Sequence, residues 1–325
     1  AKVPARTGYV NQGWSSKKNS EKATAKAKCT VNKNITLYAV QKKAVQLTFH
    51  RCDGSTWQKT TLAKGSSYSL PGVRDAEGYT FMGWSTKPMQ SVSPQYEAEE
   101  KITVNGNVDL YAVVFNRTTE TDLTEDQLPQ VDIYKYKQVI FVGDSRTEFM
   151  ENVLTGMGES ATKNVKFVCS AGKGLDWFTT TGWAQLYSIV QHDSNSILSK
   201  KTAVIFNFGV NDLSKSADYA EYYNWIAPQL KSKGCELYFM SVNPVNRLML
   251  PNAGRADRSE AAVRSFNQYM KANLSSAYTY IDMYSYLKST GYSFASDHYG
   301  TGTVDDGLHY TTRTYKRIFA KCMDS

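Results

Sequence analysis

Apolar residues in the last two thirds of the chain are gathered in short runs, which alternate with longer amphipathic stretches. Runs that are apolar at every position are typical of parallel strands whose two faces are both covered by helices. The pattern therefore predicts a doubly wound α/β domain over residues 137–325, with a parallel five-stranded sheet. The predicted strands are 139–142, 165–169, 203–208, 236–242 and 278–281, and the predicted helices are 147–157, 183–198, 218–233, 258–275 and 312–323.

The first third of the chain follows a different pattern, in which apolar and polar residues alternate between turns rich in Gly, Asn and Pro. Alternation of this kind predicts short antiparallel strands. Two motifs occur twice, Gly-Tyr-x-x-x-Gly-Trp-Ser and Leu-Tyr-Ala-Val, and they divide this region into a truncated repeat at 1–40 and a second repeat at 41–116. The polar residues 117–136, with Pro129 as their only proline, predict a linker to the α/β domain.

These repeated motifs resemble the Listeria-Bacteroides repeat, also called the internalin B-type repeat. The resemblance implies small, β-rich, ubiquitin-like modules that serve as spacers or contact surfaces on exported proteins of Gram-positive-type bacteria. It implies that this region is extracellular and non-catalytic. Because the first repeat lacks its opening strands, we expect the chain to begin inside a longer array. We expect the repeated aromatic residues to form module cores rather than a ligand-stacking surface: Trp14, Trp84, Tyr38 and Tyr111.

Three loops of the predicted α/β domain carry candidate chemistry where strands end. Ser145 follows the first strand within Gly-Asp-Ser, so its hydroxyl would stand at the carboxyl edge of the sheet and at a helix N-terminus. Gly172 and Gly174 follow the second strand, and Asn211 follows the third. A glycine N–H and an asparagine amide at neighbouring strand ends can face one oxygen atom, as an oxyanion hole requires. Taken singly, a helix cap, a glycine turn and an Asn-Asp turn explain the same residues.

A late histidine completes this set. Asp306 stands three residues before His309, and a carboxylate at that spacing can orient the imidazole and fix which ring nitrogen faces a serine. The competing pair is Asp297 and His298, but adjacent side chains diverge and make the contact less readily. The sequence therefore supplies a nucleophile, a general base and an orienting acid, which together point to acyl transfer or hydrolysis.

The four blocks, in this order and at these strand ends, resemble the SGNH, or GDSL, hydrolase family. The resemblance implies a three-layer, flavodoxin-like α/β fold over 137–325. It implies Ser145 as nucleophile, His309 as base and Asp306 as orienting acid, with Gly174 and Asn211 as oxyanion donors beside the Ser145 N–H. Gly172 competes with Gly174 for that role, and the preference for Gly174 rests on its distance from the strand.

The sequence departs from the family pattern at two positions. Cys169 stands where the second block usually has an asparagine, and Arg146 stands where many relatives carry an apolar residue. Arg146 could reach a substrate carboxylate or hydroxyl, and a supporting salt bridge is an equal alternative. Tyr310, next to the histidine, is a second candidate for substrate contact.

The resemblance and the exported repeats together imply an extracellular serine esterase that removes O-acyl groups, acetyl above all, from a carbohydrate or cell-wall polymer. An O-acetyltransferase of the same fold is one alternative, because a sugar hydroxyl can replace water as the acceptor. A surface adhesin with a non-catalytic hydrolase-like scaffold is another. No cofactor or metal is expected: the five cysteines form no Cys-x-x-Cys pair, and whether Cys29 pairs with Cys52 stays open.

The net charge of +8 lies wholly in the first third of the chain. Residues 1–116 hold 16 Lys and Arg against 8 Asp and Glu, and the remainder holds 22 of each. A neutral α/β domain argues against a nucleic-acid substrate, and the basic repeats could contact an anionic cell-wall polymer or simply aid solubility. The sequence has no apolar run of about 18 residues, so no transmembrane segment is expected.

Overall fold

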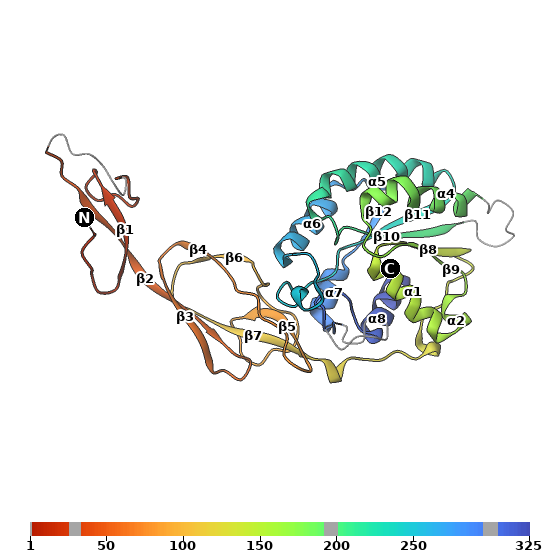
Figure 1. Ribbon diagram of the computed structural model, residues 1–325, viewed down its shortest axis with the longest axis horizontal. Coiled ribbons are helices and arrows are strands. Elements are labelled where there is room, and N and C mark those ends of the chain that lie inside the picture. The colour runs from red at the N-terminus through yellow and green to blue at the C-terminus, as the bar shows by residue number, and fades with distance from the viewer. Residues whose placement is uncertain (1, 26–33, 192–200, 295–304) are drawn as a thin grey trace. The chain divides into compact units, whose positions relative to one another are not determined.

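The computed structural model describes residues 2–25, 34–191, 201–294 and 305–325. The chain forms two compact units. The first unit comprises Ala1–Pro71, Gly83–Gln90 and Pro94–Val113, and the second comprises Gly72–Met82, Ser91–Ser93 and Val114–Ser325. In Figure 1, the first unit runs from red to yellow-orange and the second is mainly green to blue.

The N-terminal region is built of strands, as its alternating pattern predicts. The strands are β1 (Tyr9–Ser15), β2 (Tyr38–His50), β3 (Thr56–Ala63), β4 (Ser66–Ser69), β5 (Tyr79–Ser85), β6 (Lys101–Val104) and β7 (Val108–Asn116). The main sheet has the order β1-β2-β7-β5, with β3 paired to β2 as well, and β4 pairs with β6. The predicted repeat boundary at residue 40 falls inside β2, which runs unbroken from the Leu-Tyr-Ala-Val motif into the next repeat.

Aromatic residues fill the core of the first unit. Trp84 is fully buried, its ring centroid lies 4.8 Å from that of Phe49, and it stacks on Trp57 at 5.8 Å. This position fits the expectation that the repeated tryptophan is a core residue. Trp14, Tyr38 and Tyr111 are only half-buried.

The second unit contains the predicted parallel sheet. Its strands are β8 (Gln138–Gly143), β9 (Val165–Cys169), β10 (Thr202–Asn207), β11 (Cys235–Met240) and β12 (Tyr278–Ile281), in the order β12-β11-β10-β8-β9. All four neighbouring pairs are parallel. The order reverses between β8 and β10, and ligands of such sheets bind beyond the carboxyl ends of the strands at this kind of switch point.

Helices accompany these strands. The main ones are α1 (Ser145–Met157), α4 (Trp183–Gln191), α5 (Ser216–Lys231), α6 (Glu260–Asn273), α7 (Met283–Thr290) and α8 (Thr312–Met323). Shorter ones are η1 (Arg117–Thr119), η2 (Glu125–Gln127), α2 (Glu159–Thr162), α3 (Leu175–Trp177), η3 (Phe178–Gly182), η4 (Leu213–Lys215) and η5 (Leu250–Ala253). The pattern did not predict α7 or the short helices. Among the residues described, no helix is long and apolar enough to cross a membrane.

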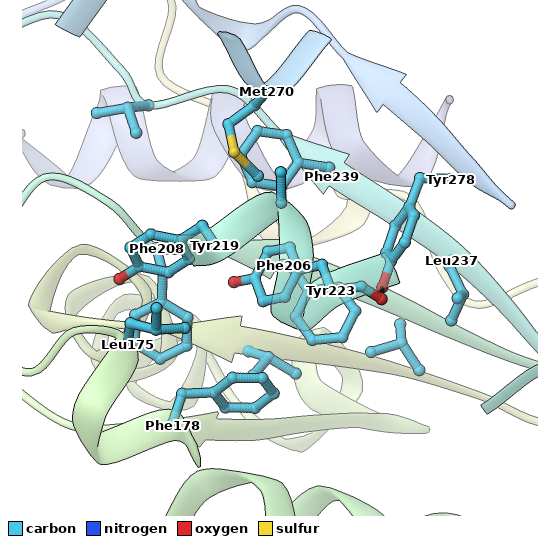
Figure 2. Packing of buried hydrophobic residues seen from close by; sticks show 14 of the residues in the cluster. Leu175, Phe178, Phe206, Phe208, Tyr219, Tyr223, Leu237, Phe239, Met270 and Tyr278 are labelled. Atoms are coloured by element: carbon cyan, nitrogen blue, oxygen red, sulfur yellow. Dashed lines mark hydrogen bonds between the residues drawn. The ribbon is translucent and has the colours of Figure 1, made fainter. Parts of the chain in front are cut away.

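The strands of this sheet are apolar on both faces, so helices cover both faces and the unit has three layers. In β8, Ile140 and Val142 join a large cluster with residues of α4, α5 and α6. Figure 2 shows the centre of this cluster, where Phe206 and Tyr223 lie close together, with ring centroids 4.8 Å apart. On the other face, the ring of Phe141 packs against that of Phe319 on α8, with ring centroids 5.8 Å apart. Figure 1 shows α4, α5 and α6 on one side of this sheet and α1, α7 and α8 on the other.

The predicted linker at 117–136 is packed within the second unit. Glu120 is buried and accepts a hydrogen bond of 3.0 Å from Nη1 of Arg317 on α8. Lys316 donates to Asp122 at 2.7 Å. Polar composition predicted a free connection, but its charged residues pair with basic residues of α8, so the segment is an ordered part of this unit.

Candidate active site

The loops that follow three neighbouring strands leave the sheet at one edge. Gly143, the last residue of β8, is level with Asn207 in β10 and with Cys169 in β9. Because all three strands run in the same direction, the segments after them emerge side by side. The register therefore brings Ser145, the loop 170–174 and Asn211 to the same edge of the sheet.

The serine turn, residues 143–147, is shaped by close packing. A Cβ atom at Gly143 would lie 2.7 Å from the carbonyl oxygen of Asn207, so only glycine fits there. Asp144 caps α1 by accepting a hydrogen bond from the N–H of Arg146 at 3.0 Å. Ser145 is the first residue of the helix, so its own N–H has no acceptor within the helix and is available to a ligand.

Three side chains form an unbroken line of hydrogen bonds. Ser145 Oγ lies 2.9 Å from His309 Nε2, and His309 Nδ1 lies 2.6 Å from Asp306 Oδ2. All three residues are at most 6% exposed. Phe149 of α1 packs edge-on against the imidazole, with ring centroids 4.4 Å apart. The structure thus brings together the predicted nucleophile, base and orienting acid. The competing pair, Asp297 and His298, lies outside the described residues.

Hydrogen bonds keep Asp306 ionised despite its burial. Desolvation alone would raise its pKa, but the contact with His309 and the N–H groups of Leu308 and His309 outweigh it and hold the pKa below the ordinary range. Those two N–H groups donate to Oδ1 at 2.9 and 2.8 Å. An ionised Asp306 fixes the tautomer of His309 in which Nε2 faces the serine as an acceptor.

For Asp144, directly before the serine, the pKa is shifted in the opposite direction. It is fully buried, and desolvation raises its pKa to about 6, against smaller lowering effects from the N–H and charge of Arg146. Its Oδ1 accepts from Arg146, whereas Oδ2 has no hydrogen-bond partner among the described residues. A buried carboxylate oxygen without a donor favours the protonated form.

The oxyanion candidates come from the second and third loops. Asn211 donates one Nδ2 hydrogen to Lys173 O at 2.8 Å, and its Oδ1 accepts from Arg258 at 2.8 Å. The second Nδ2 hydrogen is available to a ligand. Gly174 is pressed against Asp212, where a Cβ atom would lie 2.3 Å from Oδ2. Gly172, the competing glycine, lines the pocket beside Ser145, and Gly174 is not among its lining residues.

Arg146 and Tyr310 do not lie in the pocket, so the expectation that they contact substrate is not supported. Arg146 is buried and donates to three backbone carbonyls, those of Leu308, Asn243 and Pro244, at 2.9–3.0 Å. Tyr310 is also buried and donates to Pro244 O. Arg146 thereby connects the serine turn to Leu308 and to the segment that follows β11, and Tyr310 contacts the same segment. The guanidinium of Arg146 is therefore occupied by backbone carbonyls of the protein itself.

Sequence reasoning missed two arginines that line the pocket. The pocket has a volume of about 230 Å³, and its wall includes Ser145, His309, Asn211, Arg255 and Arg258. Both arginines belong to the segment between β11 and α6, which leaves the same carboxyl edge of the sheet. The position of this segment after a predicted strand was the signal from which the two arginines could have been found. Among the residues described, no cluster of three or more His, Cys, Asp or Glu side chains could hold a metal ion.

The acid loop, residues 305–310, is held in place by an ion-pair cluster around Arg117. Nη2 of Arg117 lies 2.6 Å from Asp305 Oδ2 and 2.6 Å from Asp75 Oδ2. Asp75 belongs to Gly72–Met82, the stretch of the second repeat that forms part of the hydrolase unit. Burial raises the pKa of Asp75 to about 6, although the charge of Arg117 opposes this. The residue next to Asp306 is therefore tied to sequence that precedes the α/β domain.

Asn246 joins this cluster to the turn of the acid loop. Its Nδ2 donates to Asp75 Oδ1 at 2.8 Å, and its backbone N–H donates to Gly307 O at 2.8 Å. Gly307 has φ +64°, and a Cβ atom there would lie 2.4 Å from Asn246 O. The motif Asp-Gly-Leu-His therefore needs its glycine both for a left-handed turn and for this close contact.

A model of the GDSL-like lipase/acylhydrolase family matches residues 139–322. The chain belongs to this family. The Listeria-Bacteroides repeat domain matches residues 1–40 and 46–113, which confirms the resemblance of the first third. The two parts are therefore an acylhydrolase domain, with the SGNH fold, and repeats of the kind that the sequence predicts. A search of curated proteins finds no match.

The acylhydrolase is also similar to solved structures at low identity. The catalytic domain of the peptidoglycan O-acetyltransferase A of Streptococcus pneumoniae is 16% identical, with 58% of this chain and 92% of that chain covered and a TM-score of 0.34. An acetyl xylan esterase is 11% identical, with coverages of 57% and 98% and a TM-score of 0.38. YxiM of Bacillus subtilis is 14% identical, with coverages of 87% and 97% and a TM-score of 0.36. The substrate must therefore be argued from the site itself.

Proposed function

We propose that this acylhydrolase is an extracellular serine esterase that removes O-acyl groups, acetyl above all, from a carbohydrate or cell-wall polymer. The observation that supports it most is the unbroken line from Asp306 through His309 to Ser145, with contacts of 2.6 and 2.9 Å, at a pocket of about 230 Å³. A nucleophile, a base and an orienter at these distances are what acyl transfer through serine requires.

The reaction begins when Ser145 Oγ attacks the ester carbonyl and His309 Nε2 takes its proton. Asp306 stays ionised and stabilises the imidazolium that forms. When the tetrahedral intermediate collapses, the bond to the alcohol breaks and His309 gives the proton to the leaving oxygen. Water then attacks the acyl-serine with His309 as the base, which releases the acid and restores Ser145.

Three donors stabilise the negative oxygen of the tetrahedral intermediate in this proposal: the N–H of Ser145, the second Nδ2 hydrogen of Asn211 and the N–H of Gly174. Each such donor typically contributes about 3 kcal/mol in the transition state. Gly172 is the alternative donor from the same loop, and its place on the pocket wall supports it. Arg258 holds Asn211 through Oδ1, so the asparagine presents its NH₂ group to the pocket.

The repeats support the extracellular setting and a polymeric substrate. They carry the whole positive excess of the chain, 16 basic against 8 acidic residues over 1–116. An anionic cell-wall polymer is the partner that such a charge would favour, through contacts weakened by salt. In this proposal the repeats keep the esterase near its substrate and take no part in the chemistry.

The test is hydrolysis of 4-nitrophenyl acetate by the intact chain and by Ser145→Ala, with Ser289→Ala on α7 as a matched control. We expect turnover by the parent and the control only, and acetylation of Ser145 in the parent, seen by intact-mass spectrometry after rapid quenching. Equal turnover by Ser145→Ala would remove the proposed nucleophile. No turnover by any variant would favour a non-catalytic surface protein. Acetylated sugar formed from a chito-oligosaccharide acceptor would identify a transferase.

A further inference from the structure

We infer that Arg255 and Arg258 form an anion subsite in the pocket beside Ser145, which selects O-acylated saccharides that carry a carboxylate or phosphate near the ester. This inference rests on the proposed esterase function and adds the chemical class of its substrate. The acetyl group itself is neutral, so the charge that the subsite recognises lies on the saccharide.

The pocket wall is electrostatically one-sided. Its charged side chains are the two arginines, and none of the described residues that line it is acidic. Its other lining residues are apolar, small or part of the reaction: Ser145, Phe149, Ala171, Gly172, Asn211, Gly254, Ala256, Leu308 and His309. A concave site lined by charge of one sign attracts ligands of the opposite sign more strongly than a flat surface does.

Arg258 is a half-buried cation with only neutral partners. Its Nε donates to Val210 O at 2.7 Å, Nη1 to Ala256 O at 2.8 Å and Nη2 to Asn211 Oδ1 at 2.8 Å. No ion pair joins it to a carboxylate among the described residues. Burial, followed by the nearby charge of Arg146, lowers its pKa. A desolvated guanidinium without a counter-ion is costly, and an anionic ligand would relieve that cost.

Arg255 connects the subsite to the catalytic machinery. Its Nε and Nη2 lie 3.3 and 3.2 Å from Asp306 Oδ2, and its side chain is one-third exposed and lines the pocket. A guanidinium has five N–H donors in a planar fork, so it can serve Asp306 and a substrate oxygen at the same time. The saccharide's anion would then lie close to Ser145, and the ester would be oriented by a contact outside the reacting bond.

The decisive experiment compares substrates that differ in charge alone. The first pair is an O-acetylated methyl glucuronoside and the methyl ester of the same sugar, and O-acetylated glucose 6-phosphate and O-acetylated glucose form the phosphate arm. We expect kcat/KM to be at least about tenfold higher for the charged member, mainly through KM, and this preference to shrink as salt is raised. The arm with the larger ratio identifies carboxylate or phosphate as the preferred anion.

Variants connect the preference to the two arginines. In Arg255→Gln and Arg258→Gln the ratio of charged to neutral kcat/KM should fall towards one, whereas Arg258→Lys should keep part of it. The ratio is the measure because these changes also disturb Asp306 or Asn211 and lower all rates. Arg313→Gln, which removes an equal charge from α8, should leave the ratio unchanged. A preference that survives both glutamine variants, or no preference in the parent, would overturn the subsite.

A binding measurement separates the subsite from the esterase proposal. If the parent hydrolyses neither these esters nor 4-nitrophenyl acetate, the proposed function fails, and calorimetric titration with methyl glucuronoside decides the subsite. Binding of the uronate but not of its methyl ester, lost in Arg255→Gln, would support the anion subsite without the chemistry. Equal binding of both sugars would contradict it.

Discussion

The serine turn and the acid loop each bury one aspartate, yet the pKa values of the two carboxyl groups are shifted in opposite directions. Asp306 receives hydrogen bonds on both oxygens, and these hold its pKa below the ordinary range against the effect of burial. Asp144 is equally buried but has one oxygen without a partner among the described residues, and its pKa rises to about 6. Burial is common to both, so the number of donors decides the direction of the pKa shift.

The difference separates two tasks. The acid loop must keep a negative charge beside His309 throughout the reaction, and three N–H donors and a nearby arginine serve that purpose. The serine turn must present a hydroxyl and a free N–H in a tight space, where Asp144 receives a hydrogen bond on only one oxygen among the described residues. We therefore expect changes in the acid loop to affect mainly the rate, and changes at Asp144 to affect mainly the pH dependence of stability.

The change that would break the comparison most strongly is Asp306→Asn. The amide can accept from the backbone but favours the wrong tautomer of His309, so kcat for 4-nitrophenyl acetate should fall by about 10⁴ with little effect on the fold. Initial rates and the thermal midpoint, measured side by side, check this. A variant that keeps more than about a tenth of the parent rate would show that Asp306 is not the orienting acid.

Asn211→Ala tests the stabilisation of the negative oxygen that forms in the tetrahedral intermediate. Removing one oxyanion donor should lower kcat by about 10²–10³ and leave KM nearly unchanged, because the donor acts in the transition state. Steady-state kinetics with 4-nitrophenyl acetate separates the two constants. An increase in KM alone would assign Asn211 to ground-state binding instead.

Arg117→Met loosens the acid loop without touching the triad. Removal of one partner leaves two poorly exposed carboxylates, Asp75 and Asp305, without their cation, so the free energy of unfolding should fall by about 3 kcal/mol. Displacement of the loop should lower kcat about tenfold. Urea unfolding and kinetics measure the two effects. Arg117→Lys should restore part of both, and Arg51→Met, in the first unit, should change neither.

Asp144→Asn should have the smallest effect on the rate and should act mainly on the pH dependence of stability. The folded-state pKa of Asp144, about 6, exceeds the unfolded value of about 3.9, so its contribution to stability is greatest below pH 4. The contribution falls as pH rises from about 4 to 6, by up to about 3 kcal/mol. Asp75, with a pKa raised to about 6, adds a loss in the same window.

The asparagine variant should therefore lose roughly half of the decline in unfolding free energy between about pH 4 and 6, with Asp75 responsible for the rest. Urea titrations at several pH values measure it. An unchanged slope would mean that Asp144 is already ionised at low pH. Asp306 has the opposite sign, since a lowered pKa adds stability above its unfolded value that is lost only on acidification.

Much of the hydrolase fold could be predicted because its strands are apolar at every position. Val139 to Val142 form a run of this kind, and the five predicted strands agree with the structure to within two residues at either end. α7 was missed because it is only eight residues long, Met283–Thr290, which is too short for a helical pattern to repeat more than about twice. β2 was divided in the prediction because the repeated Leu-Tyr-Ala-Val motif ends at Val40 and was taken as the end of the first repeat.

The candidate site was predictable where its residues lie in short motifs at strand ends. Ser145 and Asn211 are of this kind, and His309 lies in an equally short motif before the last helix. Arg255 and Arg258 lie in an irregular segment, and only the fold shows that it borders the pocket. Arg146 was misplaced for a physical reason: an arginine beside a nucleophile suggests substrate contact, but the three carbonyls that it satisfies come from residues about 100 and 160 positions away.

The contact of Arg117 with Asp75 and Asp305 also limits where recombination can separate the two domains. The family match of the acylhydrolase begins at residue 139, but the cluster that steadies its acid loop includes sequence from the preceding repeat. A recombination event that replaced the sequence up to and including residue 117 would remove both Asp75 and Arg117, and Asp305 would lose the cation with which it pairs. Repeat and enzyme are therefore separate as sequence families but, for this chain, must be exchanged together.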